Sequence, residues 1–255
     1  MEAEEYARID RHETAHFWYR GVHALFVGAL KREAIRQGRP LRLLDAGCGT
    51  GGLLASIGAA LPDTTRAGFD LSPLALGFAK AKADAKSETR LAQGSIEQVP
   101  FAAGSFDAVV SADVLYHAAV TDDAAALREL ARVVRPGGLV LLNLPAHREL
   151  RGAHDAVIHT ARRYEREDLQ RIAAAAGLEV ERLTGFNALL DPIVRLLRRR
   201  SGPGSGKPPK SDVSLPPAAV NGLLSAWLRF EAWLALRIEL PLGLSLFAEL
   251  RKPSS

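Results

Sequence analysis

The stretch LLDAGCGTGGLL, residues 43–54, limits the fold of this chain more than any other feature. An apolar run ends at Asp45, and four glycines follow before the apolar residues resume. Glycine permits left-handed backbone and lets a ligand approach the main chain closely. We therefore predict a buried strand over 41–44, a ligand-binding turn, and a helix that begins in this turn and runs to about residue 61.

Strand and helix patterns alternate along the following part of the chain. Apolar runs predict four further strands, at 64–69, 89–93, 106–111 and 139–144. Ser72 followed by Pro73 predicts one helix start, and Asp122 predicts another, while an apolar stripe over 18–35 predicts a helix before the first strand. This alternation is typical of an α/β fold with a mostly parallel sheet covered by helices on both faces. Such sheets bind ligands at the carboxyl ends of their strands.

Polar residues at these strand ends indicate which ligand the turn holds. Gly47, Gly49 and Gly52 satisfy GxGxxG, the pattern of a dinucleotide site. Asp70 lies where the ribose-binding acid of such a site would fall. Asp45, however, would repel a pyrophosphate in this turn by roughly 4 kcal/mol per contact at about 4 Å. S-adenosylmethionine carries an ammonium and a sulfonium without phosphate, so we predict S-adenosylmethionine as the cofactor and keep an NAD-dependent oxidoreductase as the alternative.

A series of five motifs extends this prediction to a family. In chain order they are LLDAGCGTGG, GFDLSP, AQGSIEQVPF, SFDAVVSADVLYH and LRELARVVRPGG. The series resembles that of class I S-adenosylmethionine-dependent methyltransferases of the small-molecule type, over about residues 15–185. The resemblance implies a Rossmann-like sheet of seven strands whose last strand is antiparallel. We expect segments 178–184 and 244–251 to be its final two strands.

The resemblance also implies a cofactor site, residue by residue. Asp70 would bind both ribose hydroxyls. Leu71 would flank the adenine, and Ser95 stands where the family usually has an aspartate, although Ser95 also suits a turn. Tyr19 resembles part of the family's aromatic cover, although core packing suits it equally. The full predicted set is Tyr19, Arg20, Asp45, Gly47, Gly49, Gly51, Asp70, Leu71, Ser95, Ile96, Ala112 and Asp113.

Methyl transfer needs alignment of the acceptor more than covalent machinery, but an oxygen or nitrogen acceptor can require a base. Histidine suits that role near neutral pH. His117 follows the fourth strand in DVLYH, and His154 lies in HDAVIHTARRY, a segment that resembles one recurring in a subgroup of the family. We predict His117, His154 and Tyr164 as catalytic residues; the alternative for each is a structural hydrogen bond.

The segment 186–242 separates the two expected final strands. It contains two apolar, helix-like stretches joined by a linker at about 200–217 that is rich in Gly, Pro and Ser. The domain prediction is therefore an N-terminal helical cap over 1–40, a cofactor-binding core over 41–185, this helical insertion, and a final strand and tail over 243–255. We expect the insertion to be a lid over a small, apolar acceptor, with a peripheral membrane contact or a dimer face as alternatives.

Composition excludes several other classes of function. The single cysteine, Cys48, argues against a disulfide framework or a multi-cysteine metal site, and we predict no metal. The net charge of +4 is concentrated around 198–210 rather than spread along a groove, so nucleic acid is not expected as a partner. The acidic opening MEAEEYARID does not resemble an export signal, and we expect a cytoplasmic protein. A cofactor-binding adaptor without catalysis is the remaining alternative to an enzyme.

Overall fold

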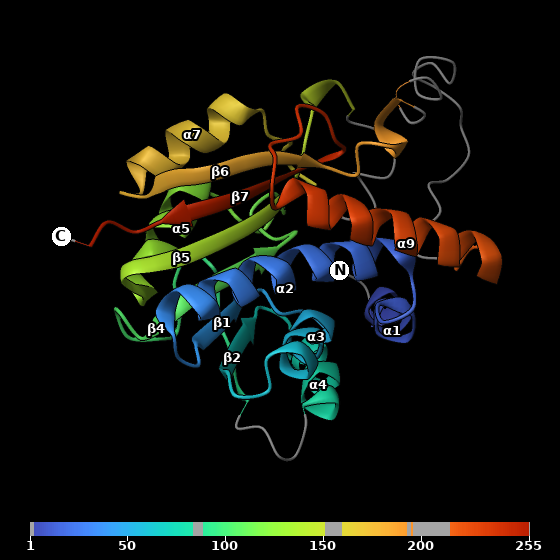
Figure 1. Ribbon diagram of the computed structural model, residues 1–255. Helices are drawn as coiled ribbons and strands as arrows, with labels where there is room; N and C mark the ends of the chain where they lie inside the picture. Colours follow the sequence, from blue (N-terminus) through green and yellow to red (C-terminus); the bar gives the residue numbers. More distant parts are fainter. Residues whose placement is uncertain (1–2, 84–88, 151–159, 193–194, 196–214, 255) are drawn as a thin grey trace.

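A computed structural model describes residues 3–83, 89–150, 160–192, 195 and 215–254 (Figure 1). Strands and helices alternate in it as the sequence predicts. The strands are β1 Arg42–Ala46, β2 Thr65–Asp70, β3 Arg90–Gln93, β4 Phe106–Ala112, β5 Val134–Pro145, β6 Glu179–Phe186 and β7 Ser245–Arg251. The helices are α1 Ala3–His12, α2 Phe17–Gln37, α3 Gly52–Ala60, α4 Pro73–Lys82, α5 Asp123–Val133, α7 Arg166–Ala175 and α9 Ala218–Ala235, with a 3-10 turn η1 at Arg148–Leu150.

The strands of the described residues form one seven-stranded sheet in the order β3-β2-β1-β4-β5-β7-β6. β1 pairs in parallel with β2 and β4, β2 with β3, and β4 with β5. β7 runs antiparallel to both of its neighbours, β5 and β6. The predicted Rossmann-like, mostly parallel sheet with an antiparallel last strand is therefore confirmed.

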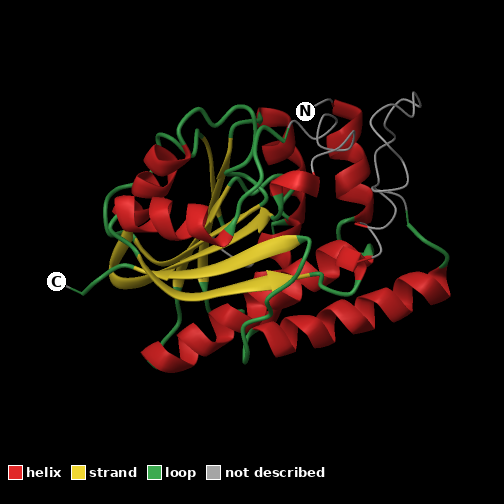
Figure 2. Cartoon of the chain, turned by 90° about the horizontal axis from the view of Figure 1, so that it is seen from above, coloured by secondary structure: helices red, strands yellow, loops and turns green. Residues whose placement is uncertain are grey.

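Helices cover both faces of the sheet (Figure 2). Two adjacent residues of β1 show how the sequence directs this arrangement, because successive side chains of a strand point to opposite faces. Leu43 joins the core that contains residues of α2 and α3, whereas Leu44 joins the core that contains residues of α5 and α7. Both leucines are fully buried. A strand buried on both faces must be apolar throughout, which is why the predicted strands read as continuous apolar runs.

The predicted helix starts are confirmed by their caps. The Ser72 hydroxyl accepts a hydrogen bond from the N–H of Ala75 (3.3 Å), and the Asp122 carboxylate accepts one from Ala125 (2.9 Å). The start of α2 uses a different residue type, since Nδ1 of His16 accepts the N–H of Trp18 (3.2 Å). Side chains thus satisfy backbone donors that a helix start leaves without intrahelical partners.

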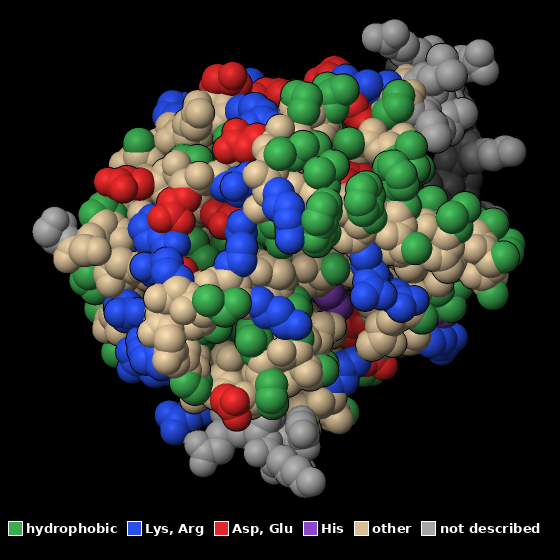
Figure 3. All heavy atoms as spheres, viewed as in Figure 1, with side chains coloured by type: hydrophobic (Ala, Val, Ile, Leu, Met, Phe, Trp, Pro, Cys, Tyr) green, Lys and Arg blue, Asp and Glu red, His purple; other side chains and the backbone are tan. Residues whose placement is uncertain are grey.

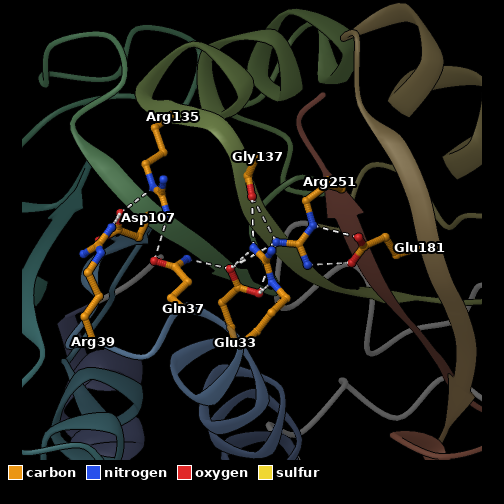
Figure 4. Close-up of polar contacts among 9 residues, drawn as sticks. Glu33, Gln37, Arg39, Asp107, Arg135, Gly137, Glu181 and Arg251 are labelled. Atoms are coloured by element: carbon orange, nitrogen blue, oxygen red, sulfur yellow. Dashed lines mark hydrogen bonds and ion pairs between the residues drawn. The ribbon is translucent and has the colours of Figure 1, made fainter. Parts of the chain in front are cut away.

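At the amino end of the sheet, a buried aspartate is surrounded by arginines (Figure 4). Asp107 is fully buried, and its carboxylate accepts hydrogen bonds from Arg39 (2.6 Å) and from the N–H of Arg42 (2.7 Å). Nε of Arg135 lies 2.5 Å from the same carboxylate. Burial alone would raise the pKa of Asp107, but these hydrogen bonds and charges hold it below its usual value.

A second buried carboxylate at this end ties α2 to β7. Glu33 of α2 is 3% exposed and accepts hydrogen bonds from Arg36 (2.6 and 2.9 Å), Gln37 (2.6 Å) and Arg251 of β7 (3.1 Å). The pKa of Glu33 is lowered: burial would raise it, but its hydrogen-bond donors and the charge of Arg251 outweigh burial. Arg251 also binds Glu181 of β6 at 2.7 Å, so one cluster joins a helix to two strands.

The expected helical insertion is described in part. β6 ends at Phe186, and α9 occupies the second of the two helix-like stretches, packed along α2. Most of the predicted linker, 200–214, lies outside the described residues, and 215–217 lead directly into α9. Within the described ranges, no helix combines the length and the apolar character needed to cross a membrane.

Candidate active site

A cavity of about 1010 Å³ opens where the parallel strands reach their carboxyl ends. Its walls come from α1, α2, the loops after β1, β2, β3 and β4, and the segments around 187–190 and 216. Pockets for one small ligand usually measure about 300–1,000 Å³, so this cavity is large enough to hold a cofactor together with an acceptor. The polar residues that the sequence places at strand ends meet here, as the position rule for open α/β sheets predicts.

The glycine turn after β1 forms one wall of the cavity. Gly47 has φ 81°, and a Cβ atom there would lie 2.4 Å from a side-chain carbon of Val114. The N–H groups of Gly47 and Cys48 both donate to the carbonyl of Phe69 (2.9 Å), which fixes the turn to the end of β2. Gly49 lines the cavity, whereas Gly51 is the N-cap of α3 and is not among the described lining residues.

Gly52 has a different role from the one that the dinucleotide pattern suggests. A Cβ atom at Gly52 would lie 2.3 Å from a carboxylate oxygen of Glu13, so glycine makes room for the segment that follows α1. Nζ of Lys82 binds Glu13 at 2.8 Å and also contacts Asp10 and the carbonyl of Thr50. Together these contacts hold α1 over the start of α3.

Asp70 is held rigidly at the end of β2. One carboxylate oxygen accepts the N–H of Gly49 and the other accepts the N–H of Ser72, both at 2.9 Å. Asp70 is half-buried and lines the cavity. Each carboxylate oxygen can accept a second hydrogen bond, so the side chain suits a pair of neighbouring hydroxyls such as those of a ribose.

Asp45 lies deeper in the same wall. It is 1% exposed, and its Oδ2 atom has no hydrogen-bond partner in the part of the chain that the structure describes. Burial raises the pKa of Asp45 to about 8, with further contributions from Asp70 and Glu13. The sequence predicts a fixed negative charge at Asp45, whereas burial in the structure favours the protonated form of this carboxyl. An orphan carboxylate oxygen in such a place fits the ammonium of the predicted cofactor.

Asp113 follows β4 at the centre of the sheet. Its backbone has φ 59°, an uncommon conformation for a residue other than glycine that often marks a functional position. Nδ2 of Asn143 lies 3.3 Å from both carboxylate oxygens, and burial raises the pKa of Asp113 to about 7. Burial also raises the pKa of the Tyr19 hydroxyl, and the charge of Asp113 adds to that shift.

The predicted adenine-side residues also line the cavity. Leu71 is 58% exposed, whereas Ile96 is buried. The hydroxyl of Ser95 accepts the N–H of Glu97 at 3.2 Å, so this serine stabilises its own turn as well as facing the cavity. Ala112 lies beside them on the cavity wall.

Helices α1 and α2 contribute more residues to the cavity wall than the sequence indicated. Tyr19 lines the cavity, while Arg20 is exposed and is not among the described lining residues. His16 and His23 also line the cavity, three residues before and four residues after Tyr19. This helical spacing could have revealed them from the sequence. Glu5, Tyr6 and Ile9 of α1 were missed, because AEEYARIDRH contains too few apolar residues to predict a packed helix.

His117 lies in the cavity wall with Thr160 and Arg163. Its Nδ1 atom accepts the N–H of Ala119 at 3.1 Å, so the neutral ring carries its proton on Nε2 and presents a donor there. Nη1 of Arg163 donates to the carbonyl of Ala146 at 2.9 Å. Among the described lining residues, Arg163 is the one lysine or arginine, and it contrasts with the acids of the cofactor side.

Of the other two predicted catalytic residues, the structure describes Tyr164. Tyr164 is 3% exposed, and its hydroxyl contacts Asp123 (3.1 Å) and the carbonyl of Leu115 (3.3 Å). It lies behind the cavity wall rather than among the described lining residues. His154 lies outside the described residues.

The fold and this site define a Rossmann-like protein of the class I S-adenosylmethionine-binding type. The methyltransferase domain family matches residues 44–142. The ubiquinone biosynthesis O-methyltransferase of Thiobacillus denitrificans is 30% identical over 226 residues, covering 78% of this chain and 91% of that protein. The chain therefore belongs to the S-adenosylmethionine-dependent methyltransferase family.

Three further proteins resemble this chain, two in sequence and one in fold. The malonyl-[acyl-carrier protein] O-methyltransferase of Dechloromonas aromatica is 33% identical over 180 residues, and the match spans 65% of each protein. The demethylmenaquinone methyltransferase of Thermus thermophilus is matched over 48% of its length. A Haloferax volcanii methyltransferase solved in complex with its activator Trm112 shares the fold, with a TM-score of 0.60, 20% identity and coverage of 99% of this chain and 95% of that one.

Proposed function

We propose that this protein transfers a methyl group from S-adenosylmethionine to an oxygen of a small, mostly apolar acceptor. The observation that carries the proposal is the large cavity, whose lining includes both the acids at the strand ends and apolar side chains with Arg163. The named activities of the Thiobacillus and Dechloromonas relatives, both O-methyltransferases, support oxygen as the methylated atom.

On the cofactor side, residues of this chain would bind and orient S-adenosylmethionine. Bound S-adenosylmethionine supplies the electrophilic methyl group. Asp70 would accept hydrogen bonds from the ribose hydroxyls, and the orphan oxygen of Asp45 would accept one from the ammonium. Gly47 and Gly49 leave the backbone accessible, while Leu71 and Ile96 would enclose the adenine.

The acceptor side combines an apolar wall with a few polar groups. Phe17, Leu150, Leu190 and Leu244 contribute apolar side chains, and Arg163 contributes a positive charge. This arrangement suits an acceptor with an apolar body and an acidic or phenolic oxygen. Alignment of that oxygen and exclusion of water would supply most of the rate acceleration.

Removal of the acceptor's proton is assigned to Asp113 in this proposal. Its carboxylate lines the cavity and has a pKa of about 7, close to the value that suits a general base at neutral pH. His117, with Nδ1 occupied by the N–H of Ala119, would instead donate from Nε2 to the acceptor oxygen. The sequence-based assignment of His117 as base thus becomes a proposal that it positions the acceptor.

The test is a methyl-transfer assay on the full-length protein with radiolabelled S-adenosylmethionine. Two acceptor probes would be compared: a catechol with a hydrocarbon tail of increasing length, and a malonyl thioester. We expect methylated product from one of these oxygen acceptors, and loss of about 1.5 kcal/mol or more of cofactor affinity in Asp70→Ala, since charged hydrogen bonds are removed. Unchanged affinity in that variant, or cofactor binding without turnover of any acceptor, would contradict the proposal and favour a non-catalytic adaptor.

A further inference from the structure

α9 has one buried face and one exposed apolar face. Leu228, Ala232 and Ala235 are buried in the core shared with α2. The opposite side exposes Val220, Leu223, Trp227, Phe230 and Trp233, each between 40% and 73% accessible. Their spacing of three or four residues places them along a single stripe of the helix. We call this stripe the outer face of α9.

Apolar residues beside the helix continue this surface. Leu215 precedes α9 and is 43% exposed, while Ile238 and Leu242 follow it and are 51% and 54% exposed. Figure 3 shows hydrophobic side chains gathered over α9 and the segments next to it. Proteins that act alone in water rarely expose a contiguous apolar surface of this kind, so the outer face requires a partner.

The exposed charges on α9 and directly after it are Arg229, Arg237 and Glu239, so positive charge is in excess. Arg229 is exposed on α9, and the guanidinium of Arg237 lies 3.9 Å from the ring centroid of Trp233. The acid of this helix, Glu231, is 4% exposed, and it accepts hydrogen bonds from the N–H of Ala188 (2.7 Å) and from Nε1 of Trp227 (3.2 Å). An apolar face with tryptophans and a basic rim matches the interface of an anionic bilayer, where indoles and arginines lie at the level of the headgroups.

α9 is also fixed next to the cavity. Oδ1 of Asn221 accepts the N–H of Phe17, and Nδ2 of Asn221 donates to the carbonyl of Ala15, both at 2.9 Å. Phe17 lines the cavity, and so does Pro216, two residues before α9 begins. A surface that held the outer face would therefore lie beside the mouth through which an acceptor enters.

We propose that the outer face of α9 docks the protein on an anionic membrane surface, so that the cavity takes its acceptor from the lipid phase. The choice of a membrane rather than a second copy of the chain follows from the excess of arginine over acid at this face, because two copies would bring two surfaces of the same net charge together. The purpose of docking rests on the proposed function, because it assumes an apolar acceptor. Docking itself does not depend on methyl transfer.

The test is co-sedimentation of the full-length protein with vesicles of equal parts phosphatidylcholine and phosphatidylglycerol, without cofactor or acceptor. Leu223→Ser and Phe230→Ser are the test variants, since both residues are exposed and lie outside the cavity. Ile35→Ser is the matched control, because Ile35 is 81% exposed but lies near the other end of α2. We expect each test variant to lower vesicle affinity about tenfold, as membrane binding scales with the apolar area inserted, and the control to leave it unchanged.

Three results would overturn the proposal: no binding by the unmodified protein, equal loss in Ile35→Ser, or a dimer that Phe230→Ser dissociates. Equal binding to vesicles of phosphatidylcholine alone would contradict the role of the arginines. Calorimetry with S-adenosylhomocysteine checks that each variant retains its fold and cofactor site. Because the vesicle assay needs no methyl transfer, failure of docking and failure of the proposed reaction are separately visible.

Discussion

At the two ends of the same sheet, the pKa values of the carboxylates are shifted in opposite directions. At the amino end, Asp107 and Glu33 are surrounded by arginine donors, and their pKa values are lowered. At the carboxyl end, no arginine or lysine of the described ranges is hydrogen-bonded to Asp45 or Asp113, and burial raises their pKa values to about 8 and about 7. Burial alone would raise the pKa of all four, so the difference lies in the partners that each end provides.

This difference separates a structural cluster from a binding site. The amino-end acids gain their counter-charges within the chain, so their stabilisation is present above their unfolded pKa and is lost as pH falls through the lower folded value. Burial favours the protonated forms of Asp45 and Asp113 in the folded chain, whereas both would be ionised near neutral pH in the unfolded chain. The folded protein is therefore less stable as pH rises from about 4 to 8 because of Asp45, until a ligand cation replaces that proton.

The largest expected effect is at the amino end. Asp107→Asn removes the charge that Arg39, Arg135 and the N–H of Arg42 share, so we expect the free energy of unfolding to fall by about 2–3 kcal/mol. Chemical denaturation at pH 7 measures this. Glu181→Ala is the control at the exposed edge of the neighbouring cluster, where about 0.5 kcal/mol or less is expected. If both variants lowered the free energy of unfolding equally, burial of Asp107 among arginines would not contribute more to stability than the exposed pair.

The same substitution at the other end should act in the opposite direction on stability. Asp45→Asn removes a carboxyl whose ionisation is unfavourable in the folded chain, so the ligand-free protein should unfold at a higher temperature at pH 8. Affinity for S-adenosylhomocysteine should fall by about 2 kcal/mol, since a charged hydrogen bond to the ammonium is lost. A thermal melt and calorimetry test the two effects. If Asp45→Asn melted lower and bound equally well, the contrast between the two ends would not hold.

The smallest effect expected is a pH dependence of cofactor binding. The ammonium favours ionised Asp45, so a proton must leave this carboxyl on binding below about pH 8. We expect the affinity for S-adenosylhomocysteine to weaken roughly tenfold between pH 8 and pH 6.5, with the loss reduced in Asp45→Asn. Calorimetry in two buffers of different ionisation enthalpy would also detect the released proton. A flat profile would place the ammonium away from Asp45.

Much of the fold could be predicted from the sequence because its signals are local. The strand and helix of the glycine turn and the caps at Ser72 and Asp122 follow from residue patterns, whereas the antiparallel last strand was implied by the resemblance to a family. α1 could not, since its position depends on contacts of Lys82 with Glu13 and Asp10 across the chain. The sequence names Asp45 as a site residue, but its protonation depends on burial, which only the packed structure defines.

Some features of the candidate site could likewise be predicted from the sequence, and others could not. Cavity residues at strand ends, such as Asp70 and Asp113, were predictable because sheet topology fixes where they lie. The roles of His117 and Tyr164 were harder to assign, because each depends on one hydrogen bond: the N–H of Ala119 occupies Nδ1 of His117, and Asp123 holds the hydroxyl of Tyr164 behind the wall.

The strand order has a consequence for biosynthesis. β7 lies between β5 and β6, although it follows both of them and all of α9 in the chain. During translation, β6 therefore leaves the ribosome with no neighbour to pair with, and the open edge of β5 stays exposed until β7 has been made. Because domains start to fold from the N-terminal side as they are synthesised, the nascent chain passes through a stage with two unpaired strand edges. A chaperone that covers such edges would act on this protein late in its synthesis, just before the last strand closes the sheet.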